Sequence, residues 1–245
     1  MLLANLSLSL ILFLILSFVC FIFGSLFLEY NIKFRSERIL NATTYLKPII
    51  GYSVLLILTY YLYFNLNIKI YFISLFFLLS SIFIFIISNK KNEILKEYFK
   101  ILFLTFPIFF IFLVYGLLAG EQFYIFRGNY WDNMNYISTA ILINEMNIKE
   151  IYNIKNNSLD ETKAVIYNGS KNIFFRPLIS AILGQLFQFK IIGFFFINYL
   201  FKIFLASQIF LSFYFLLNQI NIKYKYLISF VFIFSFWSLY TFETD

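Results

Sequence analysis

The sequence predicts an all-α polytopic membrane protein, with about six transmembrane helices and two amphipathic surface helices in a large outer loop. Of the 245 residues, 62% are hydrophobic and only 13% are charged. A soluble domain is about half apolar and about a quarter charged. The apolar residues also form runs long enough to cross the hydrocarbon core of a bilayer. This composition excludes soluble enzymes and soluble nucleic-acid-binding proteins.

Each apolar run is close to the ~20 residues that a helix needs to span a membrane. The runs are Leu2–Leu28, Ile49–Asn65, Ile68–Ser88, Ile101–Ala119, Ile191–Leu217 and Tyr226–Phe242. The first run lacks a basic leading region and a small-residue cleavage site, so we interpret it as a retained span. Only Asn65-Leu66-Asn67 separates the second run from the third, which predicts a tight antiparallel hairpin. Pro107 is expected to kink the fourth span.

Lys and Arg residues in the short loops predict the orientation, because basic residues are concentrated on the cytoplasmic side. Loops 29–48, 89–100 and 218–225 are separated by even numbers of spans and must share a side. They contain Lys33, Arg35, Arg38, Lys47, Lys90, Lys91, Lys96, Lys100, Lys223 and Lys225. The short loop opposite contains only Lys69. The net charge of +7 is therefore mainly a topology signal, and segment 120–190 is predicted to face outward.

The chain contains no histidine, which excludes His-based triads, His proton shuttles and His-ligated metal sites. Acid–base chemistry must therefore use carboxylates, lysine or tyrosine. The single cysteine, Cys20, lies within an apolar run, so no intrachain disulfide can form. We expect its side chain to be a small buried hydrophobe.

The outer segment 120–190 contains two stretches with helical periodicity. In Trp131–Ile148, one side carries Met134, Ile137, Ile141 and Ile148, which predicts an amphipathic helix at the membrane surface. Asn133, Asn144 and Asn147 are predicted to lie away from this apolar side. Pro177–Phe189 begins with proline at a favourable first helical position, which predicts a second interfacial or re-entrant helix. Between them, residues 153–172 are rich in Asn, Ser, Asp and Lys and are expected to form an exposed, mobile loop.

Asp132 is the acidic residue nearest the start of the first surface helix. With a period of about 3.6 residues, Asp132, Tyr136 and Ala140 share one helical face. A carboxylate and a phenol would then point together, with a small residue leaving room for a substrate. Asp is also a preferred helix N-cap, and that structural role remains open beside a catalytic or ligand-binding one.

Three basic residues are further candidates. Arg127 and Arg176 lie near the starts of the two surface helices, where guanidinium groups suit a phosphate, although each, taken alone, could instead anchor the protein to lipid headgroups. Lys202 lies within the fifth apolar run, where a charge is costly and marks a candidate functional site. It could instead snorkel to the interface or mark the start of the true span.

The order of these features resembles the GT-C type of membrane glycosyltransferases, which includes protein mannosyltransferases and aminoarabinose transferases. The resemblance covers residues 101–245: a span running outward, an Asp near the start of a large outer loop, two surface helices, and a second acidic position after a later span. The matching positions are Ile101–Ala119, Asp132 with Tyr136 and Ala140, Phe175-Arg176-Pro177-Leu178, and Asp245 or, less favoured, Glu243. Residues 1–100 form an additional three-span region with cytoplasmic loops. Asn133 stands where most members have a second carboxylate.

The resemblance implies that a sugar is transferred, with inversion, from a polyprenyl-phosphate donor to an acceptor on the outer face of the membrane. Asp132 would be the general base on the acceptor hydroxyl, with Tyr136 beside it. Arg176 and Arg127 would stabilise the leaving phosphate, and Asp245 or Glu243 would position a substrate or an ion. A divalent metal is compatible with these residues but is not required by the sequence.

The last run ends outside with no polar tail, so we expect this chain to be the front portion of a longer protein and inactive as a transferase alone. The alternative function is that of a transporter, a flippase or a polysaccharide-polymerase-type protein, which would need Lys202 more than Asp132. A structural anchor would leave the surface helices unexplained. We expect an integral protein of a bacterial inner (cytoplasmic) membrane, with membrane lipids and a polyprenyl-phosphate-linked sugar as partners and no nucleic acid.

Overall fold

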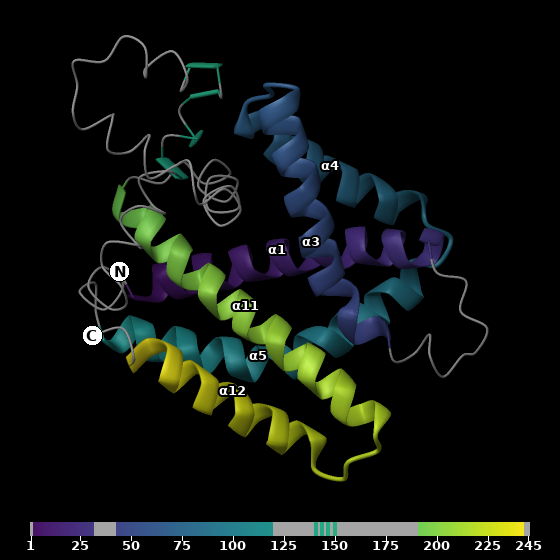
Figure 1. Cartoon of the computed structure of the whole chain (residues 1–245), viewed down its shortest axis with the longest axis vertical. Helices are drawn as coiled ribbons and strands as arrows, with labels where there is room; N and C mark the ends of the chain where they lie inside the picture. The colour runs from purple at the N-terminus through teal and green to yellow at the C-terminus, as the bar shows by residue number, and fades with distance from the viewer. Residues whose placement is uncertain are drawn as a thin grey trace. The chain divides into compact units, whose positions relative to one another are not determined.

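The computed structural model describes residues 2–31, 43–119, 140–141, 143–144, 146–147, 149–150 and 191–242 (Figure 1). These residues are predominantly helical and include no strand, which confirms the all-α class. Four helical segments among them are long and apolar enough to cross a membrane: Leu10–Leu28, Thr44–Asn65, Ile70–Ile87 and Lys91–Val114. The chain is therefore an integral membrane protein.

Each apolar run corresponds to a helix. The helices are α1 (Leu2–Asn31), α3 (Lys47–Tyr60), α4 (Ile70–Ile87), α5 (Lys91–Ala119), α11 (Ile191–Gln219) and α12 (Lys225–Phe242). A short 3₁₀ turn, η1 (Thr44–Leu46), precedes α3, and a π-helical turn, η2 (Tyr61–Asn65), extends it. Within α12, the described apolar part, Lys225–Ser235, is shorter than a span.

The predicted cytoplasmic loop 89–100 is wrong, because α5 already begins at Lys91 and only a short turn joins it to α4. The cause is a helical pattern in the residues assigned to the loop. Ile94, Tyr98 and Ile101 are buried and recur at intervals of four and three, as on one face of a helix. Lys91, Lys96 and Lys100 therefore belong to the first turns of α5, and Lys90 lies in the turn before it.

The connection between α3 and α4 is as short as the sequence predicts. Ile68 N donates a hydrogen bond to Leu62 O at 3.0 Å, which closes the turn after η2. Asn67 has a φ of 55°, in the left-handed region that asparagine tolerates better than most residues. The chain can therefore reverse within the four residues that separate η2 from α4.

The chain divides into two compact units. Unit 1 consists of Met1–Val54, Ser80–Glu121 and Lys202–Asp245, and unit 2 consists of Leu55–Leu79 and Gln122–Phe201. The predicted division of the chain at residue 100 stays a prediction.

Aromatic contacts connect the helices of unit 1. Phe13 of α1 stacks on Phe109 of α5, with ring centroids 4.0 Å apart, and meets Phe204 of α11 edge-on at 6.4 Å. Phe112 of α5 stacks on Phe234 of α12 at 5.1 Å. Such pairs add directional preference to the van der Waals packing on which helix association in a bilayer depends. The interior of unit 1 is thus built by α1, α5, α11 and α12.

Helices α1 and α3 pack so closely that no side chain fits between their backbones at two glycines. A Cβ atom added to Gly24 of α1 would overlap the carbonyl group of Lys47, and one added to Gly51 of α3 would overlap the carbonyl group of Cys20. Small residues allow this close approach in membrane proteins. Cys20 is fully buried and unoxidised, which confirms its predicted role as a small buried side chain.

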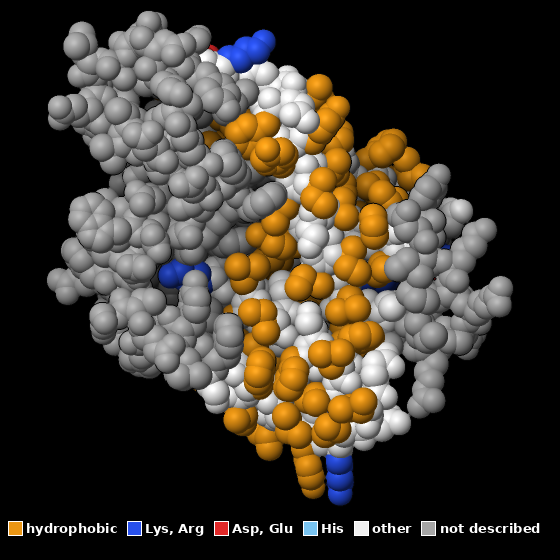
Figure 2. Space-filling view, in the orientation of Figure 1, with side chains coloured by type: hydrophobic (Ala, Val, Ile, Leu, Met, Phe, Trp, Pro, Cys, Tyr) orange, Lys and Arg blue, Asp and Glu red, His pale blue; other side chains and the backbone are white. Residues whose placement is uncertain are grey.

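Large hydrophobic side chains cover much of the outside of the helices (Figure 2). Phe103 of α5, for example, is 82% exposed. A soluble monomer rarely exposes so much contiguous apolar surface. In a bilayer, these side chains contact lipid chains, which agrees with the lengths of the four candidate spans.

Candidate functional site

The predicted transferase site lies outside the described residues. This applies to its six candidate residues, Arg127, Asp132, Tyr136, Arg176, Glu243 and Asp245, to the loop 153–172 and to the second surface helix, Pro177–Phe189. Their roles stay predictions. Lys202 is described: it lies in α11 and is half-buried.

The first surface helix differs from the prediction at its described end. Ala140 and Ile143 are buried, and Asn144 Oδ1 is buried with no hydrogen-bond partner among the described residues. The buried side therefore includes Asn144, which the sequence pattern places away from the apolar side. Because Ala140 is fully buried, its methyl group contributes to packing.

The predicted extent of that helix to Ile148 is also wrong, because residues 146–147 are not helical. Asn147 instead begins a new helical turn. Its Oδ1 accepts a hydrogen bond from Glu150 N at 3.0 Å, while its own backbone N–H donates to Glu150 Oε2 at 2.8 Å. This reciprocal pair is a capping box, which stabilises a helix start and so favours a break before it.

Two hydrogen bonds attach this part of the outer segment to the α3–α4 turn within unit 2. The buried Tyr63 donates its hydroxyl to Met146 O at 2.9 Å. Lys149 N donates to Asn67 Oδ1 at 3.3 Å. The outer segment therefore meets the turn that the sequence predicts to lie on the same side of the membrane.

We expect Tyr63→Phe to loosen this attachment. Loss of the hydroxyl leaves Met146 O without its donor and should cost about 1 kcal/mol. The measurement is limited proteolysis of the outer segment in detergent, where the variant should be cleaved several-fold faster. Tyr61→Phe is the matched control, because the Tyr61 side chain is exposed and no described residue hydrogen-bonds to its hydroxyl. Equal cleavage of both variants would contradict the attachment.

A buried charged pair lies in unit 1, between the start of α3 and the first turns of α5. Lys47 Nζ donates to Glu97 Oε2, and Thr44 Oγ1 donates to Glu97 Oε1 at 3.2 Å. The Lys47 side chain is only 11% exposed and that of Glu97 is 31% exposed. The Phe21 ring of α1 lies 5.2 Å from the ammonium group. Charge, hydrogen bond and cation–π contact therefore join three helical segments at one point.

The sequence indicates neither partner of this pair as special. Lys47 is interpreted only as a topology charge, and Glu97 is not singled out. A signal was present, because Glu97 lies three residues after Ile94 and one before Tyr98, on a segment whose periodicity is helical. Recognising α5 as extending to Lys91 would have identified Glu97 as a carboxylate close to a buried face.

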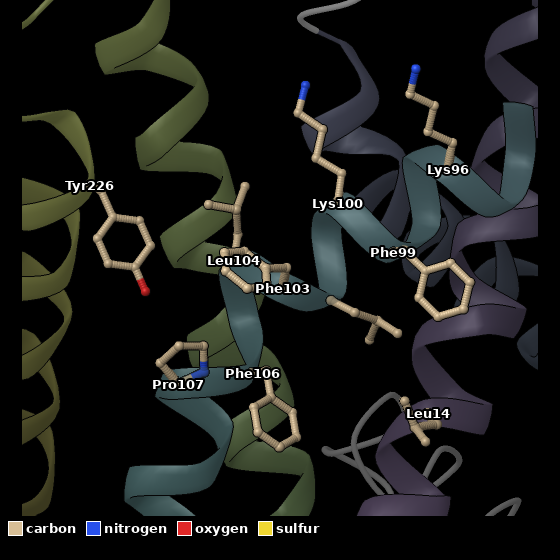
Figure 3. Close-up of a pocket in the computed structure, with 10 residues that line it drawn as sticks. Leu14, Lys96, Phe99, Lys100, Phe103, Leu104, Phe106, Pro107 and Tyr226 are labelled. Atoms are coloured by element: carbon tan, nitrogen blue, oxygen red, sulfur yellow. The ribbon is translucent and has the colours of Figure 1, made fainter.

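An apolar groove of about 880 Å³ follows α5 on unit 1 (Figure 3). Eight of its ten lining residues are apolar or aromatic: Leu14, Phe99, Leu102, Phe103, Leu104, Phe106, Pro107 and Tyr226. The other two are Lys96 and Lys100, whose ammonium groups extend in the same direction, away from Phe106 and Leu14. The groove thus has an apolar body, with two ammonium groups at one end.

The described residues contain no cluster of three or more Asp, Glu or Cys side chains that could hold a metal ion. At the groove, the chemistry available is that of two ammonium groups beside apolar surface. This combination suits the binding of an amphipathic molecule.

Comparison with known proteins gives no match. No model of a protein family matches the chain, and neither a curated protein nor a solved structure matches it. The function is therefore argued from the residues of this chain.

Proposed function

We propose that the protein is a membrane glycosyltransferase that moves a sugar from a polyprenyl-phosphate donor to an acceptor on the outer face. The proposal depends on one observation: segment 120–190 has Asp132 at the start of a predicted surface helix and Arg176 directly before Pro177. Displacement from a lipid phosphate needs a group that accepts the proton of the acceptor and a group that stabilises the leaving phosphate. A carboxylate and a guanidinium group meet these two needs.

The proposed architecture has six spans in a bacterial inner membrane, with α11 and α12 as the last two and segment 120–190 outside. The hydrogen bonds of Tyr63 to Met146 and of Lys149 to Asn67 support this topology. The basic residues assign the α3–α4 turn and segment 120–190 to the same side, and these bonds join the two.

In the proposed mechanism, Asp132 accepts the proton of the acceptor hydroxyl while the acceptor oxygen attacks the anomeric carbon. The bond from that carbon to the lipid phosphate oxygen breaks, and the configuration is inverted in one step. Arg176 and Arg127 stabilise the negative charge of the leaving phosphate. Tyr136 orients the acceptor beside Asp132, and Asp245, or less favourably Glu243, positions the donor sugar or an ion.

We expect Asp132→Asn to lower the transfer rate about a hundredfold, because the amide cannot accept the proton. The measurement uses proteoliposomes of the complete protein with a panel of radiolabelled polyprenyl-phosphate sugars. Asp160→Asn is the matched control, because it makes the same change in the predicted exposed loop of the same segment. Full activity of Asp132→Asn would reject the proposal.

Lys202→Met separates the proposed function from transport. A transporter that uses a charge within its membrane helices should lose substrate flux in this variant while tolerating Asp132→Asn. A transferase should show the reverse order of sensitivity. The same proteoliposomes supply both measurements, since labelled sugar can be followed into the lumen and into the acceptor.

A further inference from the structure

We propose that the groove along α5 binds one anionic phospholipid, with its acyl chains in the apolar body and its phosphate between Lys96 and Lys100. This inference is independent of the proposed transferase site, since all lining residues belong to unit 1 and none to segment 120–190.

The volume and apolar lining of the groove fit the acyl chains of a lipid. Its volume of about 880 Å³ lies toward the upper end of the range of ~300–1,000 Å³ for small-molecule sites. Phe103 and Phe106 are both exposed, so the groove opens on the lipid-facing side of α5. Because of this opening, lipid chains can enter the groove laterally from the bilayer. Pro107, which also lines the groove, lies inside the helix and cannot donate a backbone hydrogen bond to the carbonyl of Phe103.

The charge at the end of the groove fits a phosphate. Lys96 and Lys100 are four residues apart, which places them on one face of α5, and their side chains extend the same way (Figure 3). Lys100 Nζ lies 5.0 Å from the centroid of the Tyr45 ring, a contact that orients the ammonium group without neutralising it. No hydrogen bond or ion pair to a described residue involves Lys96.

The neighbouring carboxylates do not cancel this positive charge. The carboxylate of Glu97 already accepts hydrogen bonds from Lys47 and Thr44. Glu93, one turn earlier on α5, is exposed and forms no ion pair with the described residues. Among the described residues, no carboxylate is paired with Lys96 or Lys100, and both ammonium groups can approach one anion. An anionic lipid headgroup is complementary to this positive charge, and the acyl chains of the lipid fill the adjoining apolar body.

The test is native mass spectrometry of the full chain in detergent, with a titration of phosphatidylglycerol or phosphatidylcholine of identical chains. We expect the wild type to bind one phosphatidylglycerol at least tenfold more tightly than phosphatidylcholine. The double variant Lys96→Gln/Lys100→Gln should lose roughly tenfold or more of that preference, since each basic residue near a membrane surface is worth ~1 kcal/mol toward anionic lipid. Its binding of phosphatidylcholine should stay unchanged.

Lys90→Gln/Lys91→Gln is the matched control, because it removes two positive charges that do not line the groove. An equal loss in the control would show general surface attraction and overturn the site. Equal affinity of the wild type for the two lipids would overturn it as well. Displacement of phosphatidylglycerol by millimolar inorganic phosphate alone would reassign the lysines to a free anion. A second copy of the chain as occupant would appear as a dimer that lipid dissociates, which also overturns the proposal.

A groove-filling variant tests the apolar body separately. Leu104→Trp places a larger side chain in the groove and should weaken binding of both lipids several-fold while keeping the preference for phosphatidylglycerol. The thermal midpoint of each variant in detergent shows whether it is folded. Unchanged lipid binding by a folded Leu104→Trp would place the chains elsewhere and contradict the proposal.

Discussion

Replacement of Gly24 by alanine is expected to destabilise the protein strongly, although it adds only one methyl group. The added Cβ would overlap the carbonyl group of Lys47, which belongs to the backbone of α3 and cannot rotate away as a side chain could. The helices would have to separate. Lys47 also carries the buried ion pair with Glu97, so separation would disturb that contact too. We expect a loss of about 3 kcal/mol, the upper end of the usual range for overpacking.

The measurement is reversible unfolding by sodium dodecyl sulfate in mixed micelles, followed by circular dichroism. Gly51→Ala should behave like Gly24→Ala, because its Cβ would overlap the Cys20 carbonyl from the opposite helix. Ser53→Leu is the control, since it adds more atoms to α3 at an exposed position. We expect the control to change stability by less than about 0.5 kcal/mol. Stability of Gly24→Ala within that margin would refute the close packing of α1 on α3.

The membrane helices could be predicted from the sequence because a bilayer imposes a simple local rule. A stretch of about 20 apolar residues must satisfy its backbone hydrogen bonds within itself, so it becomes helical whatever its neighbours are. Each of the six apolar runs is helical, and four helical segments are long and apolar enough to cross a membrane. The start of α5 is harder to predict, because the charges of Lys96 and Lys100 are typical of a loop although Ile94 and Tyr98 have helical spacing.

Contacts between distant parts of the chain could not be predicted in the same way. Nothing local to Gly24 indicates that it faces Gly51, since which helices pack together is decided by the fit of whole surfaces. The hydrogen bond from Tyr63 to Met146 joins residues far apart in sequence and has no local signature. The break before Asn147 is different. The Asn147 and Glu150 spacing is a local capping signal, and it competes with the apolar period that predicts a helix to Ile148.

The transferase site and the groove show the same contrast. Asp132 and Arg176 can be proposed from residue type and order alone, without knowing which residues they contact. The proposed lipid groove depends on Leu14, Phe103 and Tyr226, which come from three helices. Their side chains contain no polar atom except the hydroxyl oxygen of Tyr226. Each is unremarkable in its own segment. Only the packing of α1, α5 and α12 makes them one surface.

Breaking the buried pair of Lys47 and Glu97 is the second change with a large expected effect. Glu97→Leu leaves the ammonium group of Lys47 almost buried with no carboxylate beside it, and removing one partner of a buried pair costs ~3–5 kcal/mol. The partial exposure of Glu97 favours the lower end of this range. Lys47→Met should cost less, because the carboxylate that it leaves unpaired is 31% exposed and keeps its hydrogen bond from Thr44.

The double variant Lys47→Met/Glu97→Leu distinguishes the cost of an unpaired charge from the loss of a stabilising contact. If desolvation dominates, the double variant should recover most of the stability lost in either single variant, because no charge remains buried. The same detergent unfolding measurement gives the coupling energy, which we expect to be at least about 2 kcal/mol. Glu93→Leu is the control, since Glu93 is exposed on the same helix and forms no ion pair with described residues. Purely additive losses in the double variant would mean that Lys47 and Glu97 act independently. Recovery would show that the pair must be kept or removed as a unit where α3 begins beside α5.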